Sequence, residues 1–449
     1  MKKIIALSGI IIFAITFSSC KKYLDAKSDK SLQIPSSVSD LQALLDEGSD
    51  MNGDYGVSFG EASADNYYMT DDQYNQMNQE NRNTYIWANK NYSNFPNDWA
   101  YLYNVINIAN IVLDNIKSIE ANPQNQSAWN NAKGSALFFR GYSFLQGAFI
   151  FCKAYDESTA EQDYGMALKL TSDFNAPTIR ANLKETYTQI IGDLKNAMVL
   201  LPDFPVNVLR PSKSSCYALL ARTYLSMGSY DSCLKYADLS LKIKSDLMNY
   251  NSISSGNKYP FSQFNKEDLF DNIASQPNYY TDYYGQVDTT LYNSYAENDL
   301  RKFLFFKQNS IGYYFTGSYV GYYMYIGLAT DETYLMRAEC NARLGNKDAA
   351  LNDLNTLMVT RWSAGTFVPF TAATSQDALN IILQERRKEL IFRNLRWMDI
   401  KRLNKDGANI TLTRIIGGQT YTLPPNDNRF ALPLPADIIQ MTGMPQNPF

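Results

Sequence analysis

Residues 214–243 read SSCYALLARTYLSMGSYDSCLKYADLSLKI. Large apolar and small residues recur at three- and four-residue steps on both sides of Gly228: Tyr217, Leu220, Ala221 and Tyr224 before it, and Cys233, Ala237 and Ser240 after it. These steps predict two helices, and Gly228 predicts the turn between them. Small side chains allow the helices to approach closely, and aromatic side chains fill the space beside the crossing. The stretch therefore predicts a packed helical hairpin.

A second stretch repeats this scheme. In residues 331–358 the corresponding positions hold, in order, Tyr334, Ala338, Gly345, Ala350, Leu354 and Leu357. The shared offsets from the turn match the small and large positions of a tetratricopeptide repeat. Two copies in one register predict a helical-repeat scaffold, and two unrelated antiparallel hairpins are the alternative.

Four more stretches predict helices. Ser39 is placed to cap a short helix that runs to Leu45. Hydrophobic periodicity predicts three longer helices, over Asp98–Ile119, Ala132–Phe151 and Leu183–Leu201. Pro202 ends the last of these helices, and Gly141 and Gly147 allow close helix approach in the second.

Residues 250–330 have a different character. They are rich in Tyr, Asn, Ser and Gly, with little helical periodicity. Thr316-Gly317 predicts a turn between two strands, Tyr313–Phe315 and Ser318–Tyr325. The segment therefore predicts loops with a short β-hairpin.

The C-terminal part combines a helix with an irregular end. A loop follows Trp362, a long helix begins near Ser375, and the proline-rich end starts at Leu423. That end is too apolar for a free tail, so we expect it to pack over the helical body. The predicted fold class is mainly α: a tetratricopeptide-like helical-repeat scaffold with long irregular loops and a few short β-hairpins.

The N-terminus predicts export and attachment to a membrane. Lys2 and Lys3 precede fourteen mostly apolar residues, and Ser18-Ser19-Cys20 follows them. This order is typical of a secretory signal, and its apolar part is shorter than the about 20 residues of a membrane span. Because Cys20 follows the small pair, the site resembles a bacterial lipobox. We expect residues 1–19 to be a lipoprotein signal peptide, Cys20 to be acylated, and residues 20–35 to form a lipidated tether; a plain signal peptide with an incidental cysteine is the alternative.

Composition limits the chemistry that the chain can perform. It contains no histidine, which excludes Ser-His-Asp and Cys-His catalysis and most zinc sites. The GxxxxGK[ST] and GxGxxG motifs are also absent from the sequence. A formal net charge of −4 gives no electrostatic reason to bind nucleic acid or anionic lipid. We expect no metal and no cofactor, while a glycosidase that uses two carboxylates stays open.

The remaining cysteines predict packing. Cys152, Cys216, Cys233 and Cys340 stand among helix-forming residues without a CxxC spacing. Buried thiols act as small apolar fillers, and this is the expected role of all four. A Cys216–Cys233 disulfide is the alternative.

A basic stretch lies near the C-terminus. Gln384–Leu403 holds seven basic residues: Arg386, Arg387, Lys388, Arg393, Arg396, Lys401 and Arg402. An anion or nucleic-acid site is one interpretation. The other is a structural network in which Glu385, Glu389 and Asp399 pair with arginines beside a buried Trp397, since bidentate Arg–carboxylate pairs fix helices in one geometry. We favour the structural network.

The same stretch resembles the signature of the SusD/RagB family, the surface-exposed substrate-binding lipoproteins of Bacteroidota outer membranes. Four other segments are similar to this family in its order: the mature start Cys20–Asp25, the loop Ala64–Tyr68, the helix Ala329–Glu339, and the ending with Ala431–Pro435 and Gln446–Pro448. The resemblance implies a single domain over 36–449, with a helical part at about 36–250, a loop-rich ligand-side insertion at about 250–330, and a C-terminal SusD/RagB part at about 331–449.

The resemblance also implies a function. It predicts a non-enzymatic protein, lipid-anchored at the extracellular side of the cell outer membrane. There it would bind an oligosaccharide or polysaccharide and deliver it to a SusC-like TonB-dependent transporter. Peptide binding, as in the RagB branch, is one alternative; a carboxylate-pair surface glycosidase and a pure protein-binding scaffold are others.

Aromatic and amide residues on the loops are the candidate ligand contacts. Sugars present axial hydrogens to flat rings and hydroxyls to amides and carboxylates, and tyrosine and tryptophan give a large contact area at low entropic cost. The candidates are Asp65, Asn66, Tyr67, Tyr74, Trp87, Tyr279, Tyr280, Tyr283 and Tyr284. Trp99, at the start of the predicted helix Asp98–Ile119, is expected in the core instead.

Overall fold

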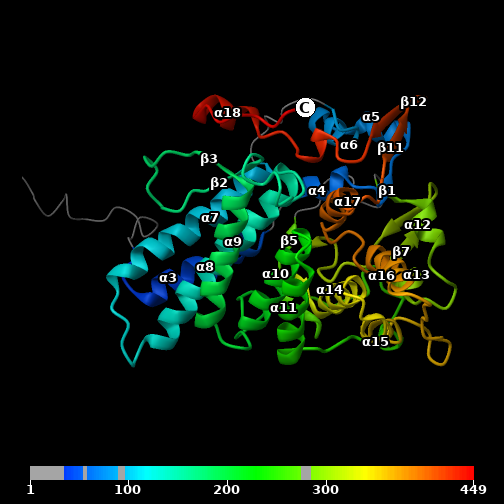
Figure 1. The fold of residues 1–449 in the computed structure, drawn as a ribbon, viewed down its shortest axis with the longest axis horizontal. Coiled ribbons are helices and arrows are strands. Elements are labelled where there is room, and N and C mark those ends of the chain that lie inside the picture. The colour runs from blue at the N-terminus through cyan, green and yellow to red at the C-terminus, as the bar shows by residue number, and fades with distance from the viewer. Residues whose placement is uncertain (1–34, 54–57, 89–96, 275–284) are drawn as a thin grey trace, which may run out of the picture.

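The computed structural model describes residues 35–53, 58–88, 97–274 and 285–449, and Figure 1 shows how their elements are arranged. Long helices stand side by side through one half of the molecule, and the other half combines further helices with short strands and loops. The predicted signal peptide, Cys20 and nearly all of the predicted tether lie outside the described residues.

Both predicted helical hairpins are confirmed. The first consists of α10 (Lys213–Ser226) and α11 (Tyr230–Ile243), and the second of α14 (Thr330–Arg343) and α15 (Lys347–Met358). Gly228 and Gly345 occupy the two turns with φ of 73° and 86°, a left-handed conformation that favours glycine. Because α11 packs against α14, the two hairpins stack into one helical body.

The other predicted helices are present with small shifts of their ends. They are α3 (Val38–Leu45), α7 (Asp98–Asn115) with the 3-10 turn η3 (Ile116–Ser118), α8 (Gln126–Phe151), α9 (Leu183–Leu200) and α16 (Ser375–Glu389). The cap of α3 is Ser37 and not Ser39, because the Ser37 hydroxyl accepts from the Asp40 N–H while the Asp40 carboxylate accepts from the Ser37 N–H. This reciprocal pair is a capping box.

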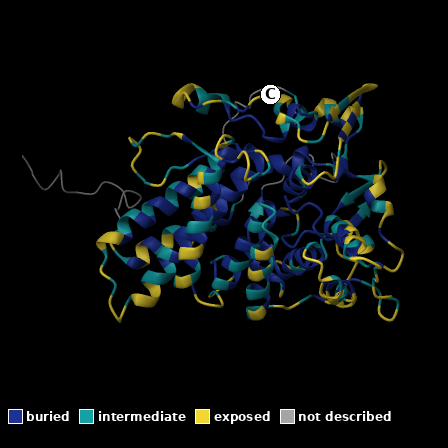
Figure 2. Cartoon of the chain, in the orientation of Figure 1, coloured by how far each residue is buried: buried dark blue, intermediate teal, exposed yellow. Residues whose placement is uncertain are grey.

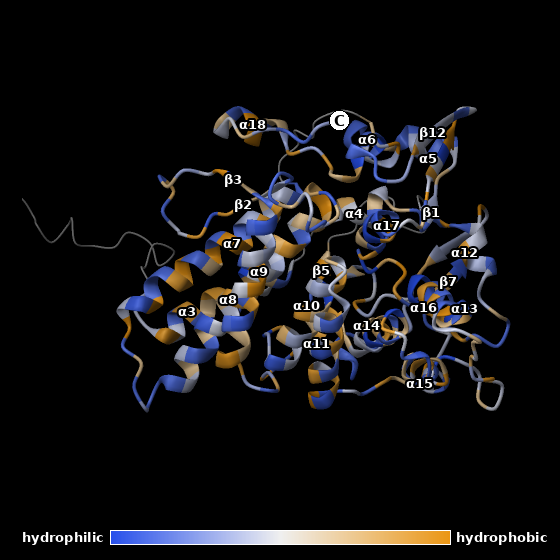
Figure 3. Ribbon diagram, in the orientation of Figure 1, coloured by the Kyte–Doolittle hydropathy of each residue, from blue (hydrophilic) through white to orange (hydrophobic). Residues whose placement is uncertain are grey.

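Helix α8 is the centre of the helical body. It packs against α7 on one side and α9 on the other, and its residues from Ala132 onward are almost all buried (Figure 2). A Cβ at Gly147 would lie 2.3 Å from the Met166 side chain, and one at Gly141 would lie 3.3 Å from Leu194 of α9. These contacts confirm close approach at the two glycines. Figure 3 shows hydrophobic and hydrophilic residues alternating around α7, as expected for a helix with one buried face.

Shorter helices complete the chain. They are the π-helical turn η2 (Ser49–Gly53), α4 (Phe59–Ser63), α5 (Asp71–Gln76), α6 (Gln79–Tyr85), η4 (Tyr250–Ser252), α12 (Thr289–Asn293), α13 (Arg301–Leu304), α17 (Arg396–Lys405), η6 (Asn428–Phe430) and α18 (Ala436–Thr442).

The strands form two-stranded antiparallel pairs. They are β1 (Tyr67–Tyr68) with β6 (Gln286–Val287), β2 (Tyr164–Ala167) with β3 (Arg180–Asn182), β4 (Asp268–Phe270) with β10 (Leu328–Ala329), β5 (Ile273–Ala274) with β9 (Met324–Tyr325), β7 (Phe306–Gln308) with β8 (Tyr313–Phe315), and β11 (Leu412–Ile416) with β12 (Gln419–Leu423).

The predicted hairpin around Thr316-Gly317 is wrong in its pairing. Tyr313–Phe315 is a strand, but its partner is Phe306–Gln308, which precedes it. The Thr316 N–H donates to the Phe305 carbonyl at 2.7 Å, and a Cβ at Gly317 would lie 2.5 Å from the Phe305 ring. Thr316 and Gly317 therefore lie alongside Phe305 and do not form the predicted turn. Strand β9 pairs with β5 instead of β8.

The C-terminal end packs over the helical body, as expected. The Leu432 N–H donates to the Ile150 carbonyl of α8 at 2.9 Å, and Leu434 is buried. Two features of this end were not predicted, the β11–β12 hairpin and helix α18. The hairpin turns at Gly417 and Gly418, both with positive φ.

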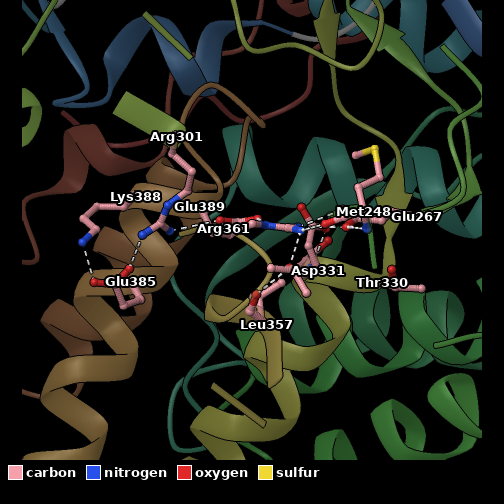
Figure 4. A network of polar contacts seen from close by, with 12 residues as sticks. Met248, Glu267, Arg301, Thr330, Asp331, Leu357, Arg361, Glu385, Lys388 and Glu389 are labelled. Carbon is pink, nitrogen blue, oxygen red and sulfur yellow. Dashed lines mark hydrogen bonds and ion pairs between the residues drawn. The ribbon is translucent and has the colours of Figure 1, made fainter. Parts of the chain in front are cut away.

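A buried network of charges joins the loop-rich insertion to the C-terminal helices (Figure 4). Arg361 donates through Nε to Glu389 Oε1 at 2.8 Å and through Nη1 to the Met248 carbonyl at 2.8 Å, and its Nη2 lies 2.9 Å from Glu267 Oε1. Arg301 donates through Nη1 to Glu389 Oε2 at 3.0 Å. Glu389 therefore bridges two arginines that have no exposed surface.

The basic stretch Gln384–Leu403 is confirmed as structural. Arg402 pairs with Glu339 at 2.6 Å, and both Arg402 and Arg386 pair with Asp399, at 2.8 and 2.9 Å. Trp397 is buried beside them. One detail differs: Glu385 and Glu389 pair with Arg301, and Glu389 also with Arg361, so the acids of this stretch reach arginines outside it.

The four described cysteines are free and buried, which confirms their role as packing residues. The alternative Cys216–Cys233 disulfide is not formed. The thiol that interacts with Cys233 is that of Cys340, since α11 packs on α14.

Candidate ligand-binding site

The structure gives structural partners to four of the predicted contact residues. Asp65 accepts from Arg396 Nε and Nη2 at 2.7 and 2.9 Å. Burial opposes its charge, but Arg396 holds the pKa of Asp65 well below its ordinary value. The Asn66 amide donates to Glu61 at 2.7 Å, the Tyr67 hydroxyl to the Ala62 carbonyl at 2.7 Å, and the Trp87 indole N–H to the Ser63 carbonyl at 3.0 Å. These hydrogen bonds fix the three side chains to α4.

These contacts leave little surface for a ligand. Asn66, Tyr67 and Trp87 are buried, and Asp65 is engaged by two arginines, Arg396 and Arg387. Ligand contact at these four positions stays a prediction, and the contacts favour a structural role. Tyr74 is half-buried, with its ring 6.0 Å from that of Tyr85. The other candidates, Tyr279, Tyr280, Tyr283 and Tyr284, lie outside the described residues.

A pocket of about 550 Å³ lies elsewhere, between α7, α8, η2 and α18. Residues from the loop between β2 and β3 and from the base of the insertion complete its wall. The described lining residues are Ser49, Asp50, Met51, Gly53, Trp99, Ala100, Tyr101, Leu102, Tyr103, Asn104, Val105, Asn107, Tyr142, Ser143, Phe174, Thr178, Asn272, Ile326, Ile438 and Thr442. We call this cavity the α7 pocket.

One wall of the α7 pocket is aromatic. The Trp99 and Tyr103 rings are stacked, with centroids 4.5 Å apart and planes at 22°, and Phe151 packs edge-on against Trp99. The Tyr103 hydroxyl donates to the Ala167 carbonyl at 2.7 Å, which fixes the ring. At the rim, Phe174 keeps 85% of its surface exposed although it is fully apolar. Exposed aromatic surface beside a pocket marks a binding region.

Two polar side chains line the deep end. Asn272 is 6% exposed and Ser143 is 2% exposed. The Asn272 carbonyl accepts from the Ile326 N–H at 2.9 Å, which fixes its backbone. Among the described residues, however, no group pairs with the Asn272 amide or the Ser143 hydroxyl. Neither belongs to the polar side-chain atoms that are sealed from solvent without a partner, so both open into the pocket and are available to a ligand.

The neighbouring polar groups are already paired, so they act as supports. The Tyr142 hydroxyl donates to the Ile326 carbonyl at 2.8 Å, and burial raises the pKa of Tyr142 to about 12, so it stays neutral. The Asn52 amide donates to the Asp271 carbonyl at 2.8 Å. A Cβ at Gly53 would lie 2.7 Å from the Ile273 carbonyl oxygen, so η2 contacts the base of the insertion closely.

Asp98 ties the start of α7 to α4. Its Oδ2 accepts from the Ser58 and Phe59 N–H groups at 2.8 and 2.7 Å. Burial raises the pKa of Asp98 to about 7, against the effect of these two hydrogen bonds. Asn97 caps α7 by accepting from the Ala100 N–H at 3.0 Å. The aromatic wall therefore starts from a helix end that is fixed on both sides.

One serine motif was missed by sequence reasoning. Residues 56–60 read GVSFG, the GxSxG spacing of a hydrolase nucleophile. Ser58 is buried, its N–H donates to Asp98, and the chain has no histidine to activate its hydroxyl. Ser58 is therefore assigned a structural role at the start of α4.

The α7 pocket itself was only partly visible in the sequence. Trp99 was expected in the core, and it is buried as expected, yet it also lines the pocket. Asn272 and Ser143 carry no sequence signal, since Ser143 lies inside a helix and Asn272 follows a short strand. Only the fold brings them together.

Two family profiles match the chain in sequence order. Residues 22–225 match a profile described as "Starch-binding associating with outer membrane", and residues 261–448 match the profile of the SusD family. The chain belongs to the SusD/RagB family. In the stretch Gln384–Leu403, which resembles the family signature, buried ion pairs hold α16 and α17 in place.

Relatives of this SusD/RagB protein are distant. "SusD-like protein P2" of Formosa agariphila is 24% identical over 422 residues, with 78% of this chain and 79% of the relative covered. A SusD superfamily structure from Bacteroides thetaiotaomicron matches with a TM-score of 0.76 at 20% identity, covering 92% of this chain and 100% of that one. A structure titled "Laminarin binding SusD-like protein" matches with a TM-score of 0.64 at 18% identity, covering 91% and 97%. At these identities the structures establish the fold alone.

Within the described part of the chain, none of the helices combines the length and the hydropathy that a membrane crossing requires.

Proposed function

We propose that this SusD/RagB protein is a lipid-anchored binding protein of the outer-membrane surface that captures an oligosaccharide and delivers it to a SusC-like TonB-dependent transporter. The observation that carries the proposal is the α7 pocket, which is lined by the stacked rings of Trp99 and Tyr103 and by two polar side chains without a protein partner among the described residues, Asn272 and Ser143. Flat rings and hydrogen-bonding groups are the two features that recognise a sugar.

The family supports the same reading. One of the two matching profiles is described as starch-binding, and a structural neighbour is titled laminarin-binding. The proposed N-terminal organisation is a signal peptide over 1–19, acylated Cys20 and a tether to about residue 35, followed by one domain over 36–449.

Binding without catalysis fits the lining of the pocket. A glycosidase that uses two carboxyl groups places them about 5–9.5 Å apart around the bond it breaks. Among the described lining residues of the α7 pocket, Asp50 is the one carboxylate. We therefore propose recognition and transfer, and not hydrolysis, as the task of this site.

A binding screen tests the ligand class. The chain from residue 21 onward is titrated with neutral oligosaccharides of several linkages and with peptides of similar size, by calorimetry. The expected result is saturable binding of at least one oligosaccharide without release of new reducing ends. Binding of peptides alone would favour the RagB-like alternative, and new reducing ends would favour the glycosidase.

Cys20→Ala tests the anchor. Because acyl chains on Cys20 are the proposed membrane contact, the variant is expected to lose the membrane fraction and to keep its ligand affinity. Cell fractionation and calorimetry measure the two outcomes. Retention of the variant in the outer membrane would contradict the anchor, whatever its affinity.

Tyr74→Ala and Tyr283→Ala test the predicted loop aromatics. If the rings stack on sugar, each substitution should remove about 1 kcal/mol of binding free energy, which weakens the affinity roughly fivefold. Tyr164→Ala, which removes an exposed tyrosine outside the predicted contact residues, is the control. Unchanged affinity in both variants would remove these two residues from the site. Trp87→Ala is less useful, since its buried indole also supports the fold.

A further inference from the structure

The wall of the α7 pocket carries few charged side chains. Among its described lining residues, Asp50 is charged and none is a lysine or arginine. The Asp50 carboxylate accepts from the Asn104 amide at 3.1 Å and is exposed at the pocket. A negatively charged ligand would therefore meet a carboxylate and no lining cation.

Three cations near lining residues in the sequence are engaged elsewhere, and the first of them, Arg140, pairs with Asp193 at 2.7 Å. Lys169 donates to the Ala176 carbonyl at 2.5 Å. Arg180 donates to the carbonyls of Gly165, Phe151 and Pro445 and to the side chain of Asn447. These donors hold the β2–β3 loop and the C-terminal end in place, so they are not free to meet a ligand anion.

Further acids stand next to lining residues in the sequence. Glu47 precedes Ser49 and accepts from its hydroxyl at 2.8 Å, Asp173 precedes Phe174, and Asp437 precedes Ile438. Together with Asp50, these acids outnumber the cations Arg140, Lys169 and Arg180, so the formal charge of the described residues beside the lining residues in the sequence is negative.

The deep end offers hydrogen bonds without charge. The Asn272 amide can donate and accept, and so can the Ser143 hydroxyl, and both stand beside Ile326 and the neutral Tyr142. Moving a carboxylate or sulfate into such a place removes its hydration without a paired cation, which is strongly unfavourable. A hydroxyl group faces no such penalty.

We propose that the α7 pocket selects uncharged, hydroxyl-bearing ligands and rejects glycans that carry carboxylate or sulfate groups. The inference rests on the proposed function for the ligand being a glycan, and adds the substrate class: neutral sugar units. The Asp50 carboxylate at the mouth of the pocket repels anionic ligands, while the Asn272 and Ser143 side chains bind the hydroxyl groups of neutral sugars.

Matched ligand pairs test the proposal. Each pair consists of a neutral hexose oligosaccharide and the uronate of the same linkage and length, obtained by oxidation at C6. The chain from residue 21 onward is expected to bind the neutral member about tenfold or more tightly, since the anion loses hydration without a partner. Equal or tighter binding of the uronate would overturn the proposal.

Asp50→Asn separates charge from shape. The variant is expected to improve the affinity for the uronate relative to that for the neutral member about two- to fivefold, as an exposed charge contributes little. Asp348→Asn makes the same charge change at a remote position that is 94% exposed, and should alter neither affinity. If Asp50→Asn leaves the ratio of the two affinities unchanged, Asp50 has no role in the rejection.

Salt provides a second readout. From about 0.01 M to about 1 M salt the Debye length falls from about 30 Å to about 3 Å, so the contribution of Asp50 should vanish and wild type and Asp50→Asn should converge. A difference between them that persists at high salt would contradict an electrostatic cause.

Failure of the proposed function gives a different result from failure of this inference. A parallel series with neutral and acidic peptides is measured under the same conditions. If neutral peptides bind, acidic ones do not, and no glycan binds, the glycan proposal fails while the charge selection stands. If no neutral compound of either series binds, both are overturned.

Discussion

Arg361→Ala is expected to lower the free energy of unfolding by about 3–5 kcal/mol, because it leaves buried carboxylates without their partner. Arg361 has no exposed surface and contacts Glu267, Glu389 and the Met248 carbonyl (Figure 4). Arg301 still pairs with Glu389 in the variant, but Glu267 keeps no arginine partner among the described residues; its carboxylate retains the Met248 N–H and the Tyr319 hydroxyl. Urea unfolding followed by tryptophan fluorescence measures the change.

The matched control removes a cation from the surface. Lys242 pairs with Asp238 at 2.6 Å and is 68% exposed, so Lys242→Ala should cost no more than about 0.5 kcal/mol. If Arg361→Ala costs as little as Lys242→Ala, the network does not hold the insertion. The double variant Arg361→Ala, Glu389→Gln should cost less than the sum of its parts, because the two residues share one contact.

The decrease in the free energy of unfolding caused by Arg361→Ala should also depend on pH. Burial raises the pKa of Glu267 to about 7, and Arg361 opposes this rise. A carboxyl whose folded pKa exceeds its unfolded pKa stabilises the folded state at low pH and loses that contribution as pH rises through the folded value. Without Arg361 the pKa of Glu267 is higher still, so the deficit of the variant should be larger at about pH 8 than at about pH 5. A deficit that is equal at both pH values would contradict this account.

The helical scaffold could be predicted because its signals are local. The hairpins around Gly228 and Gly345 each follow from a run of about thirty residues, in which periodicity and one glycine suffice. Pairing between strands was harder. Tyr313–Phe315 was recognised as a strand, but its partner depends on how Thr316 and Gly317 contact Phe305, which no local pattern contains.

The structural role of the basic stretch could be predicted from the sequence, but its ion-pair partners could not. Its role as a buried network followed from the mixture of arginines and carboxylates, while the partners Arg301 and Arg361 lie outside it and are brought to Glu389 only by the fold.

The ligand site was the least predictable part. Sequence reasoning chose loop residues by their type, and the structure places Asn66, Tyr67 and Trp87 in buried hydrogen bonds around α4. The α7 pocket depends instead on polar groups that lack a partner. Whether Asn272 is paired is a property of its surroundings, so it becomes visible only when those surroundings are known.

Asn272→Leu is expected to abolish most of the ligand affinity while leaving the stability of the free protein unchanged or slightly higher. Each hydrogen bond of about 1 kcal/mol that the amide makes to a ligand corresponds to roughly a fivefold change in affinity. In the free protein the Asn272 amide has no hydrogen-bond partner among the described residues. An apolar side chain of similar shape therefore breaks no hydrogen bond within the protein and should not lower its stability. Calorimetry with a bound oligosaccharide and thermal unfolding without it measure the two effects.

The control is the same substitution at a buried asparagine that is fully paired. Asn404 donates to the Ile410 carbonyl at 2.9 Å and accepts from its N–H at 2.6 Å, so Asn404→Leu should lose about 1–3 kcal/mol of stability and, away from the pocket, keep its affinity. Loss of affinity without loss of stability at Asn272, and the reverse at Asn404, would show that the Asn272 amide binds the ligand and that the Asn404 amide stabilises the fold. Loss of stability at Asn272 as large as that at Asn404 would mean that Asn272 is a structural residue, and the deep end of the α7 pocket would then lose its assigned role.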